Sequence, residues 1–281
     1  LETEFGVSLF MPAHMKPSGQ AGAKVVSVNP GNVTKGLPVI HAVVLIMDPV
    51  TGRPLALVDG TWLTALRTGA IGGLAAQVLS RKDSSVVALF GAGVQARTQL
   101  EAVRCVRDIQ EVRVVSLSET SAQQLASELE GVTALGLSDP DIAIAGADIV
   151  IAATSSTTPV FNGYQIEPGT HVTGVGSFTI DMREVDTELI TRARVVVDQR
   201  DAILDEGGDI VGPIRDGVVD ESIMHAEIGE ILLGEKEGRR DSEQITFFKS
   251  VGNAVQDLAV ASLVLEVAER EDLGVVVDLG G

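Results

Sequence analysis

Val86-Val87-Ala88-Leu89-Phe90-Gly91-Ala92-Gly93-Val94-Gln95-Ala96 is the stretch that decides the fold of this chain. An apolar run typical of a strand ends in two glycines that one residue separates, and a helical pattern follows from Ala96 to Val106. Gly91 allows a tight turn, Gly93 lets the backbone approach a pyrophosphate, and Ala96 lets the helix pack closely on the strand. The free N–H groups at the start of that helix favour phosphate charge. The pattern therefore predicts a dinucleotide site, and a plain structural turn is the alternative.

Composition disfavours several classes of function. The chain has 281 residues, of which 45% are hydrophobic and 21% charged, as in ordinary globular proteins. Its formal net charge of −18 argues against nucleic acid or an anionic membrane as a partner. A single cysteine and four scattered histidines predict neither disulfides nor a metal site. No apolar run approaches ~20 residues, and the acidic start is unlike a signal peptide, so we expect a cytoplasmic protein.

The chain before the glycine turn has the pattern of a separate domain. Strand-like runs at 23–28, 39–47 and 55–58 are separated by turns rich in Asn, Pro and Gly, which predicts a sheet with antiparallel pairs. A helix rich in Ala and Gly is expected from about 63 to 79. A second helix, at about 253–269, is expected to return to this part. We therefore predict one mixed α/β domain that comprises residues 1–85 and 254–281.

Residues 86–253 alternate between strand and helix patterns. This rhythm with apolar strands predicts a Rossmann domain, which is a doubly wound parallel sheet. The clearest strand patterns span 86–90, 111–117, 132–135, 149–153, 170–175 and 194–198. Ligands of such sheets bind beyond the carboxyl ends of the strands. Three of these ends carry polar side chains, at Thr154-Ser155-Ser156, Gly176-Ser177-Phe178 and Asp198.

Two cations are expected on apolar faces. Lys24 shares a strand face with Val26 and Val28, and Arg67 shares a helix face with Ile71 and other apolar residues. A buried, unpaired cation costs several kcal/mol, so each needs an anionic partner. Two readings stay open, a substrate carboxylate that Arg67 binds in bidentate fashion, or a structural acid. Asp59 and Glu227 are candidates for that acid.

Several other polar positions are candidates for a chemical role. Asp198 is either a general acid or base or the cap of the next turn, and His171 is expected to be a satisfied core histidine. The acidic segment 205–209 lacks the alternating spacing of a calcium loop. NAD-binding proteins of this fold have an acid for the ribose at the end of the second strand. At that place the chain has Ser116 and Ser118, with Glu119 just beyond. The choice between NAD and NADP stays open.

Together these residues resemble the ornithine cyclodeaminase/mu-crystallin family, which includes archaeal-type alanine dehydrogenases and ketimine reductases. The resemblance covers nearly the whole chain. Its motifs are Met11-Pro12, Gly22-Ala23-Lys24, Pro30-Gly31-Asn32, Gly36-Leu37-Pro38, Leu63-Thr64-Ala65-Leu66-Arg67-Thr68, the Gly91 turn, Ala147-Asp148-Ile149-Val150, Pro168-Gly169-Thr170-His171-Val172, Arg183-Glu184-Val185-Asp186, Ala226-Glu227-Ile228-Gly229-Glu230 and Phe248-Lys249-Ser250.

The resemblance implies a homodimer whose first domain supplies the dimer interface and the substrate pocket, with a Rossmann domain for NAD or NADP. It implies that Lys24 and Arg67 bind substrate, and that Ser250 and Val251 lie beside the nicotinamide. It also implies that Thr68 and the Gly91 turn contact the cofactor phosphates. We expect the other cofactor contacts in that turn and at strand ends, from Gly91, Ala92, Gly93, Val94, Gln95, Ser116, Ser118, Glu119, Thr154 and Ser155.

The chain departs from the family pattern at two places. A further substrate-binding Arg precedes Met-Pro in the family, and this sequence begins too late to show it clearly. Phe178 stands where cyclodeaminases carry an Asp for the distal amine of the substrate. An aromatic ring accepts no proton, so cyclodeamination is disfavoured. The sequence predicts an oxidoreductase for a small amino, imino or 2-oxo acid, with pyruvate plus ammonia or a cyclic ketimine as substrates. A cyclodeaminase and a non-catalytic NADP-binding protein are the alternatives.

Overall fold

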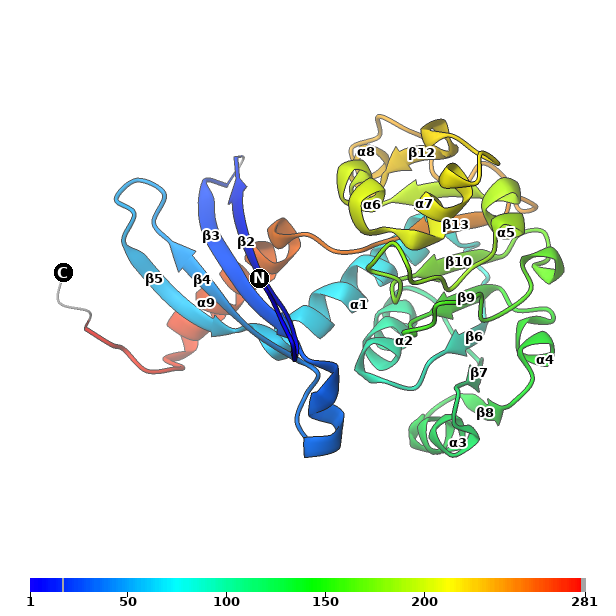
Figure 1. Ribbon diagram of the computed structural model, residues 1–281, viewed down its shortest axis with the longest axis horizontal. Coiled ribbons are helices and arrows are strands. Elements are labelled where there is room, and N and C mark those ends of the chain that lie inside the picture. Colours follow the sequence, from blue (N-terminus) through cyan, green and yellow to red (C-terminus); the bar gives the residue numbers. More distant parts are fainter. Residues whose placement is uncertain (17, 279–281) are drawn as a thin grey trace. The chain divides into compact units, whose positions relative to one another are not determined.

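The computed structural model describes residues 1–16 and 18–278, which divide into two compact units (Figure 1). Unit 1 consists of Leu1–Arg67 and the chain from Asn253 onward, and unit 2 consists of Thr68–Gly252. The first boundary falls inside helix α1 (Gly60–Leu79), so this helix contributes to both units. The sequence placed that boundary after the helix, at residue 85, because an uninterrupted helical pattern gives no sign of a change of unit.

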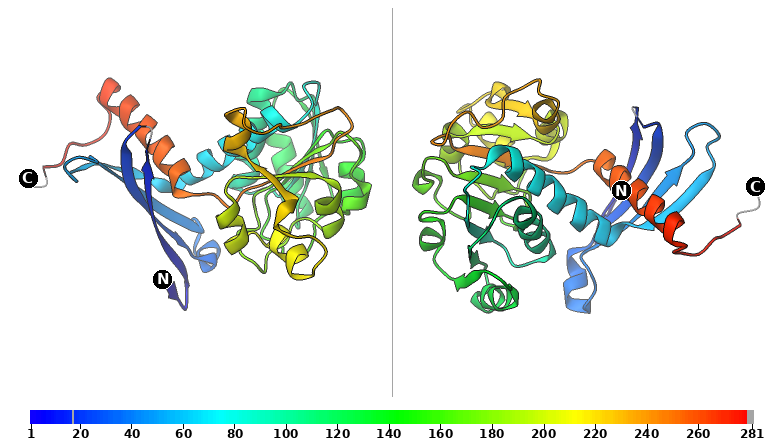
Figure 2. Two further views of the ribbon diagram at one scale, coloured as in Figure 1. Left: turned by 90° about the horizontal axis from the view of Figure 1, so that it is seen from above. Right: turned by 180° about the vertical axis from the view of Figure 1, so that it is seen from behind.

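Unit 1 is built on a sheet that, among the described residues, has five antiparallel strands in the order β1-β2-β3-β4-β5. The strands are β1 (Glu2–Thr3), β2 (Gly6–Met15), β3 (Gln20–Val28), β4 (Ile40–Met47) and β5 (Pro54–Asp59), with the 3-10 helix η1 (Pro30–Lys35) between β3 and β4. Helix α9 (Ala254–Glu271) packs against β2 to β5, as Figures 1 and 2 show. Val44, Leu63 and Leu258 lie in the core between them. The predicted antiparallel sheet and returning helix are confirmed.

Unit 2 contains a sheet of eight parallel strands within the described ranges, in the order β12-β11-β13-β10-β9-β6-β7-β8. The strands are β6 (Val86–Phe90), β7 (Glu111–Val115), β8 (Thr133–Leu137), β9 (Ile149–Ala152), β10 (His171–Gly174), β11 (Arg194–Val197), β12 (Met224–Glu227) and β13 (Thr246–Lys249). The helices are α2 (Val94–Val106), α3 (Glu119–Glu128), α4 (Pro140–Ile144), α5 (Thr187–Arg192), α6 (Arg200–Glu206), α7 (Gly208–Arg215) and α8 (Ile228–Leu232), with 3-10 turns η2 (Gly163–Gln165) and η3 (Glu221–Ile223).

Helices cover both faces of this sheet. Alternate strand residues pack against α2 and α3 on one face, as Leu89 does with Leu100. Their neighbours, such as Phe90, pack against α4 to α7 on the other face. Period-two alternation thus supplies apolar side chains to both faces of the sheet. The doubly wound parallel sheet predicted from the sequence is confirmed.

The carboxyl ends of the parallel strands meet at one edge of the sheet, which we call the carboxyl edge. Gly91 follows β6, Thr154 lies just after β9, and Ser250 follows β13. Strand β6 pairs with β7 on one side and with β9 on the other. The order of connections therefore reverses between β6 and β9, which is where doubly wound sheets form a ligand crevice.

Candidate active site

The glycine turn has the geometry that a pyrophosphate requires. Gly91 has a φ of 108°, and a Cβ on it would lie 2.4 Å from the carbonyl oxygen of Ala153, so only glycine fits. Gly93 is the N-cap of α2 and provides no side-chain cap, and a Cβ there would have open space around it. The first N–H groups of α2 are thus left for an anion. Ala96 is fully buried against the sheet, as predicted.

Other predicted phosphate contacts surround this turn within unit 2. Ala92 and Gln95 are half-buried, and Val94 is exposed. Thr68 is buried, and its carbonyl accepts a hydrogen bond from Gln99 of α2 at 2.5 Å. Helix α1 approaches α2 closely, because a Cβ on Gly69 would lie 2.5 Å from the carbonyl oxygen of Thr98.

The end of β7, where the adenosine ribose binds in this fold, is polar and acidic. Ser116 is half-buried, whereas Ser118 is exposed and caps α3 by accepting a hydrogen bond from the Ser121 amide at 3.3 Å. Glu119 is exposed at the first position of α3. The sequence from Ser116 to Leu137 contains no Lys or Arg. This end of the sheet therefore offers a carboxylate and no cation.

Asp198 follows β11 and accepts hydrogen bonds at both carboxylate oxygens. Oδ2 accepts from Ser250 Oγ at 2.7 Å and from the Gly252 amide at 2.8 Å, and Oδ1 accepts from the Gln199 amide at 2.8 Å. These contacts favour the capping role for Asp198 over general acid–base work. The hydroxyl of Ser250 is likewise held by Asp198, and Val251 is half-buried.

The ends of β9 and β10 are joined by a buried acid that sequence reasoning missed. Glu184 accepts a hydrogen bond from Thr154 Oγ1 at 2.8 Å, and Ser155 beside it is exposed. Phe178 lies in the loop after β10 with its side chain 43% exposed. Asp209 and Lys249 form a buried ion pair that the sequence reasoning also missed. The signal for such groups is a charged residue inside an otherwise apolar segment, as at Lys249 after Phe247 and Phe248.

Lys24 and Arg67 meet one acid in unit 1. Lys24 Nζ lies 2.6 Å from Asp257 Oδ2, and Arg67 Nε donates to Asp257 Oδ1 at 3.0 Å. Arg67 Nη1 also donates to Gln256 Oε1 at 3.2 Å. All three charged residues are buried, with Asp257 fully so. We call Lys24, Arg67 and Asp257 the cation cluster.

Both cations have a structural acid as partner, which was one of the two readings from the sequence, but the acid is Asp257, and the candidates Asp59 and Glu227 were wrong. Asp59 accepts hydrogen bonds from the amides of Thr61 and Trp62 at the start of α1, and Glu227 accepts from the Arg200 amide and belongs to the cap of α8. Backbone amides thus donate to both carboxylates. Asp257 shares the buried face of α9 with Leu258 and Ala261, and this spacing was the available signal.

The cation cluster carries one positive charge more than its single acid balances. Burial lowers the pKa of Lys24, the charge of Arg67 lowers it further, and Asp257 opposes both. An anion with one negative charge would complete the balance, and a guanidinium matches a carboxylate geometrically. The cluster therefore suits a monocarboxylate ligand.

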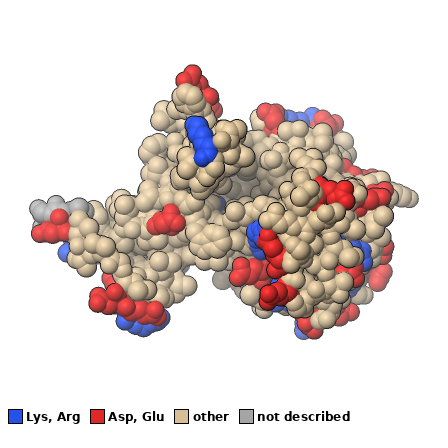
Figure 3. Space-filling model, turned by 90° about the horizontal axis from the view of Figure 1, so that it is seen from below, with Lys and Arg blue, Asp and Glu red and all other residues tan. Residues whose placement is uncertain are grey.

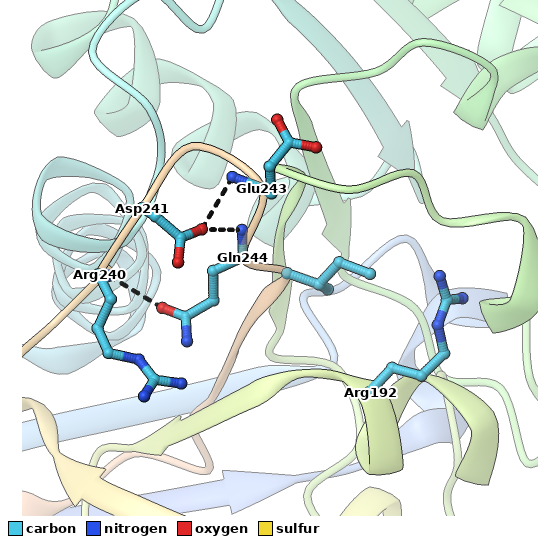
Figure 4. Close-up of a pocket in the computed structure, with 6 residues that line it drawn as sticks. Arg192, Arg240, Asp241, Glu243 and Gln244 are labelled. Carbon is cyan, nitrogen blue, oxygen red and sulfur yellow. Dashed lines mark hydrogen bonds between the residues drawn. The ribbon is translucent and has the colours of Figure 1, made fainter.

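A pocket of about 470 Å³ in unit 2 is formed by other residues (Figure 4). It is lined by Arg192 at the end of α5 and by five residues that lead into β13, namely Arg240, Asp241, Glu243, Gln244 and Ile245. It therefore lies at the amino ends of the strands. Asp241 Oδ1 accepts from the amides of Glu243 and Gln244. These bonds stabilise the loop, and none of the predicted functional residues lines the pocket.

The surface charge, the helices and the possible metal ligands also bear on function. Acidic side chains are spread over the face in Figure 3, among fewer basic ones. Within residues 1–16 and 18–278, no helix is long and apolar enough to cross a membrane, and no group of three His, Cys, Asp or Glu is placed to hold a metal ion.

Comparison with known proteins identifies the family. The model of the ornithine cyclodeaminase/mu-crystallin family matches residues 2–272. An alanine dehydrogenase of Archaeoglobus fulgidus is 40% identical over 274 residues, 98% of this chain and 84% of the relative. The Thermococcus litoralis Delta(1)-pyrroline-2-carboxylate reductase, solved with NADH and L-proline, gives a TM-score of 0.95 at 42% identity over 99% of this chain and 87% of that one. An archaeal alanine dehydrogenase dimer with bound NAD gives 0.94 at 40% identity over 99% and 86%. The resemblance seen in the motifs is thus confirmed, and this chain belongs to the ornithine cyclodeaminase/mu-crystallin family.

Proposed function

We propose that this protein is an NAD-dependent oxidoreductase that transfers hydride between the nicotinamide and the α-carbon of a small amino or cyclic imino acid. The observation that carries the proposal is the cation cluster, in which two buried cations share one acid. The relatives of this chain include an alanine dehydrogenase and a pyrroline-2-carboxylate reductase, which supports the proposal.

Arg67 and Lys24 would bind the substrate. The free part of the Arg67 guanidinium would hold the carboxylate, while Asp257 and Gln256 fix its orientation. Lys24, whose pKa burial lowers, would polarise the carboxylate or transfer a proton. Phe178 and Val251 would supply apolar contacts, and an aromatic ring at 178 disfavours the cyclodeaminase alternative.

The glycine turn would hold the coenzyme. Gly91, Ala92, Gly93, Val94 and Gln95 would surround the pyrophosphate, with Thr68, Thr154, Ser155 and Ser250 along the same molecule. NAD(H), when bound, supplies the hydride chemistry. Glu119 and the lack of cations from Ser116 to Leu137 favour a ribose hydroxyl over a 2′-phosphate, and so NAD over NADP.

We also propose a cytoplasmic homodimer, with dimerisation and substrate binding in unit 1 and coenzyme binding in unit 2. The archaeal alanine dehydrogenase solved as a dimer supports this assembly. Exposed Phe10 on β2 and Leu57 on β5 add apolar surface to the sheet of unit 1.

The test is a screen at 340 nm of NADH and NADPH with pyruvate plus ammonia and with 1-pyrroline-2-carboxylate. We expect NADH oxidation with at least one of these substrates and slower oxidation of NADPH. Ammonia release from ornithine without net absorbance change would instead indicate a cyclodeaminase. Coenzyme binding without turnover of any substrate would indicate a binding protein.

A further inference from the structure

Two acids and one lysine are buried behind the carboxyl edge. Glu184, Asp209 and Lys249 are each fully buried, and Lys249 Nζ lies 2.9 Å from Asp209 Oδ2. Lys249 ends β13, the strand beside β10 (Figure 1), and Asp209 lies in the first turn of α7. We call these three residues the acid cluster.

Donors surround the Glu184 carboxylate on all sides. Oε1 accepts from the Thr154 amide at 2.5 Å and from its hydroxyl at 2.8 Å. Oε2 accepts from the amides of Gly176 and Ser177 at 2.6 and 3.2 Å. Burial raises the pKa of Glu184, and the charge of Lys249 opposes this shift. An ionised carboxylate accepts all four bonds, whereas a protonated one would place its own hydrogen against a donor.

The bonds from Gly176 and Ser177 to Glu184 join the start of the 176–184 loop to its end. Its end is fixed because Asp209 Oδ1 accepts from the amides of Glu184 and Val185 at 2.7 and 3.1 Å. Its start is fixed by Glu184, and a Cβ on Gly176 would lie 2.0 Å from the carbonyl oxygen of Thr154. Between these two points, the loop exposes the apolar side chains of Phe178 and Ile180.

We infer that Glu184 is a positioning residue that sets the shape of the 176–184 loop, and through it the binding of coenzyme and imino acid. The inference rests on the proposed function for the identity of these ligands. Because Glu184 is fully buried, it acts through Thr154, Gly176 and Ser177. It joins the ends of β9 and β10 at the edge where doubly wound sheets bind dinucleotides.

The experiment compares Glu184→Gln with a matched control, Asp186→Asn. The side-chain amide that Glu184→Gln introduces would direct hydrogens at N–H donors, so the loop start loses part of its anchor. Asp186 lies in the same segment and also accepts two backbone bonds, from Gly163 at 2.8 Å and Leu189 at 2.9 Å, neither of which belongs to the loop. Gly176→Ala is a second variant in case Glu184→Gln does not fold. Its Cβ would lie 2.0 Å from the carbonyl oxygen of Thr154 and 2.5 Å from Glu184 Oε1, so it displaces the loop start from the same carboxylate.

Three quantities are measured on the full chain: the Kd of NADH, the KM of the imino acid against kcat, and tryptic cleavage after Arg183. Arg183 is held in the native loop region by bonds to Val185 and Thr187. We expect Glu184→Gln and Gly176→Ala to raise the Kd of NADH and the KM of the imino acid at least tenfold. We also expect trypsin to cleave the peptide bond after Arg183 in both variants. Asp186→Asn should change Kd and KM less than twofold, and the bond after Arg183 should stay resistant to trypsin.

Values within twofold of wild type and an uncut loop in Glu184→Gln would overturn the inference, as would equal effects in Asp186→Asn. If the wild-type protein bound no NADH, the proposed function would be wrong. The tryptic experiment would still decide whether Glu184 closes the loop, so the two failures are distinguishable.

Discussion

The cation cluster of unit 1 and the acid cluster of unit 2 have opposite charge balances. Lys24 and Arg67 share Asp257, which leaves one positive charge over. Lys249 pairs with Asp209, and its charge also acts on Glu184. Two acids and one lysine leave one negative charge over, but backbone amides donate to both acids. Amide donors compensate the acid cluster within the chain. The cation cluster has no equivalent set of acceptors among the described residues beyond Gln256, so its excess charge is available for a ligand. A buried charged group thus indicates a ligand site only when the chain itself does not neutralise it.

Removal of Arg67 should have the largest effect on activity. We expect Arg67→Ala to lower kcat/KM for the imino acid by about 10²–10³-fold, in line with the loss of a buried, hydrogen-bonded charge partner. The Kd of NADH should stay within twofold, because the glycine turn is unchanged. Steady-state kinetics and a fluorescence titration measure both, with the exposed Arg53→Ala as control. An unchanged kcat/KM would mean that the cation cluster is only structural.

Lys249→Met should produce the largest loss of stability. It leaves two buried carboxylates without a cation, for which we expect a decrease of about 3–5 kcal/mol in the free energy of unfolding. Urea denaturation measures the change, and Lys82→Met, at an exposed position, is the matched control. If Lys249→Met were as stable as wild type, the backbone donors alone would satisfy the acid cluster.

His171 extends the comparison to a buried group with neutral partners only. Its ring contacts the hydroxyls of Thr246 and Thr173 at 2.9 and 3.0 Å. Burial, together with the charges of Arg239 and Arg107, lowers its pKa to about 3. Between pH 6.5 and about pH 3, His171 therefore binds a proton in the unfolded chain but stays neutral in the folded protein.

Stability should consequently fall as the pH decreases from 6.5 toward 3, by at most about 1.4 kcal/mol per pH unit from this group. Unfolding measured at several pH values should show a shallower dependence in His171→Asn than in wild type. His41→Asn, at an exposed histidine, should keep the wild-type slope. Equal slopes in both variants would assign the acid sensitivity to other groups.

Asp198→Asn should have the smallest effect. An amide at this position still accepts one of the bonds from Ser250 and Gly252, so we expect a loss of about 1–2 kcal/mol in stability. If Asp198 only caps the turn, kcat should fall less than tenfold. A loss of kcat above about 10³-fold, with unchanged stability, would restore the general acid or base reading.

The sequence predicted what depends on neighbouring residues. Gly91, Gly93 and Ala96 lie within one turn, so their spacing alone predicts strand, turn and helix, and the structure confirms it. The apolar faces around Lys24 and Arg67 likewise follow from period-two and helical spacing, and both residues are buried.

What the sequence did not predict depends on distant contacts. Asp257 is 190 positions from Arg67, and no local pattern joins them. Glu184 and Lys249 lie in family motifs, but local sequence assigns them no role, because their partners come from the ends of other strands and from α7. Strand β2 was missed since Pro12 interrupts its pattern. Its residues beyond Val7 pair with β3 alone among the described strands, so this part of β2 is an edge, where proline is tolerated.

Helix α1 makes two chemical tasks dependent on one helical register. Arg67, proposed for the carboxylate, and Thr68, proposed for the coenzyme and tied through its carbonyl to α2, are consecutive residues in it. One residue inserted between them would rotate one side chain by about 100° relative to the other. A substitution at either position keeps the helical register, whereas a single-residue insertion or deletion here would misalign the contacts to both ligands at once.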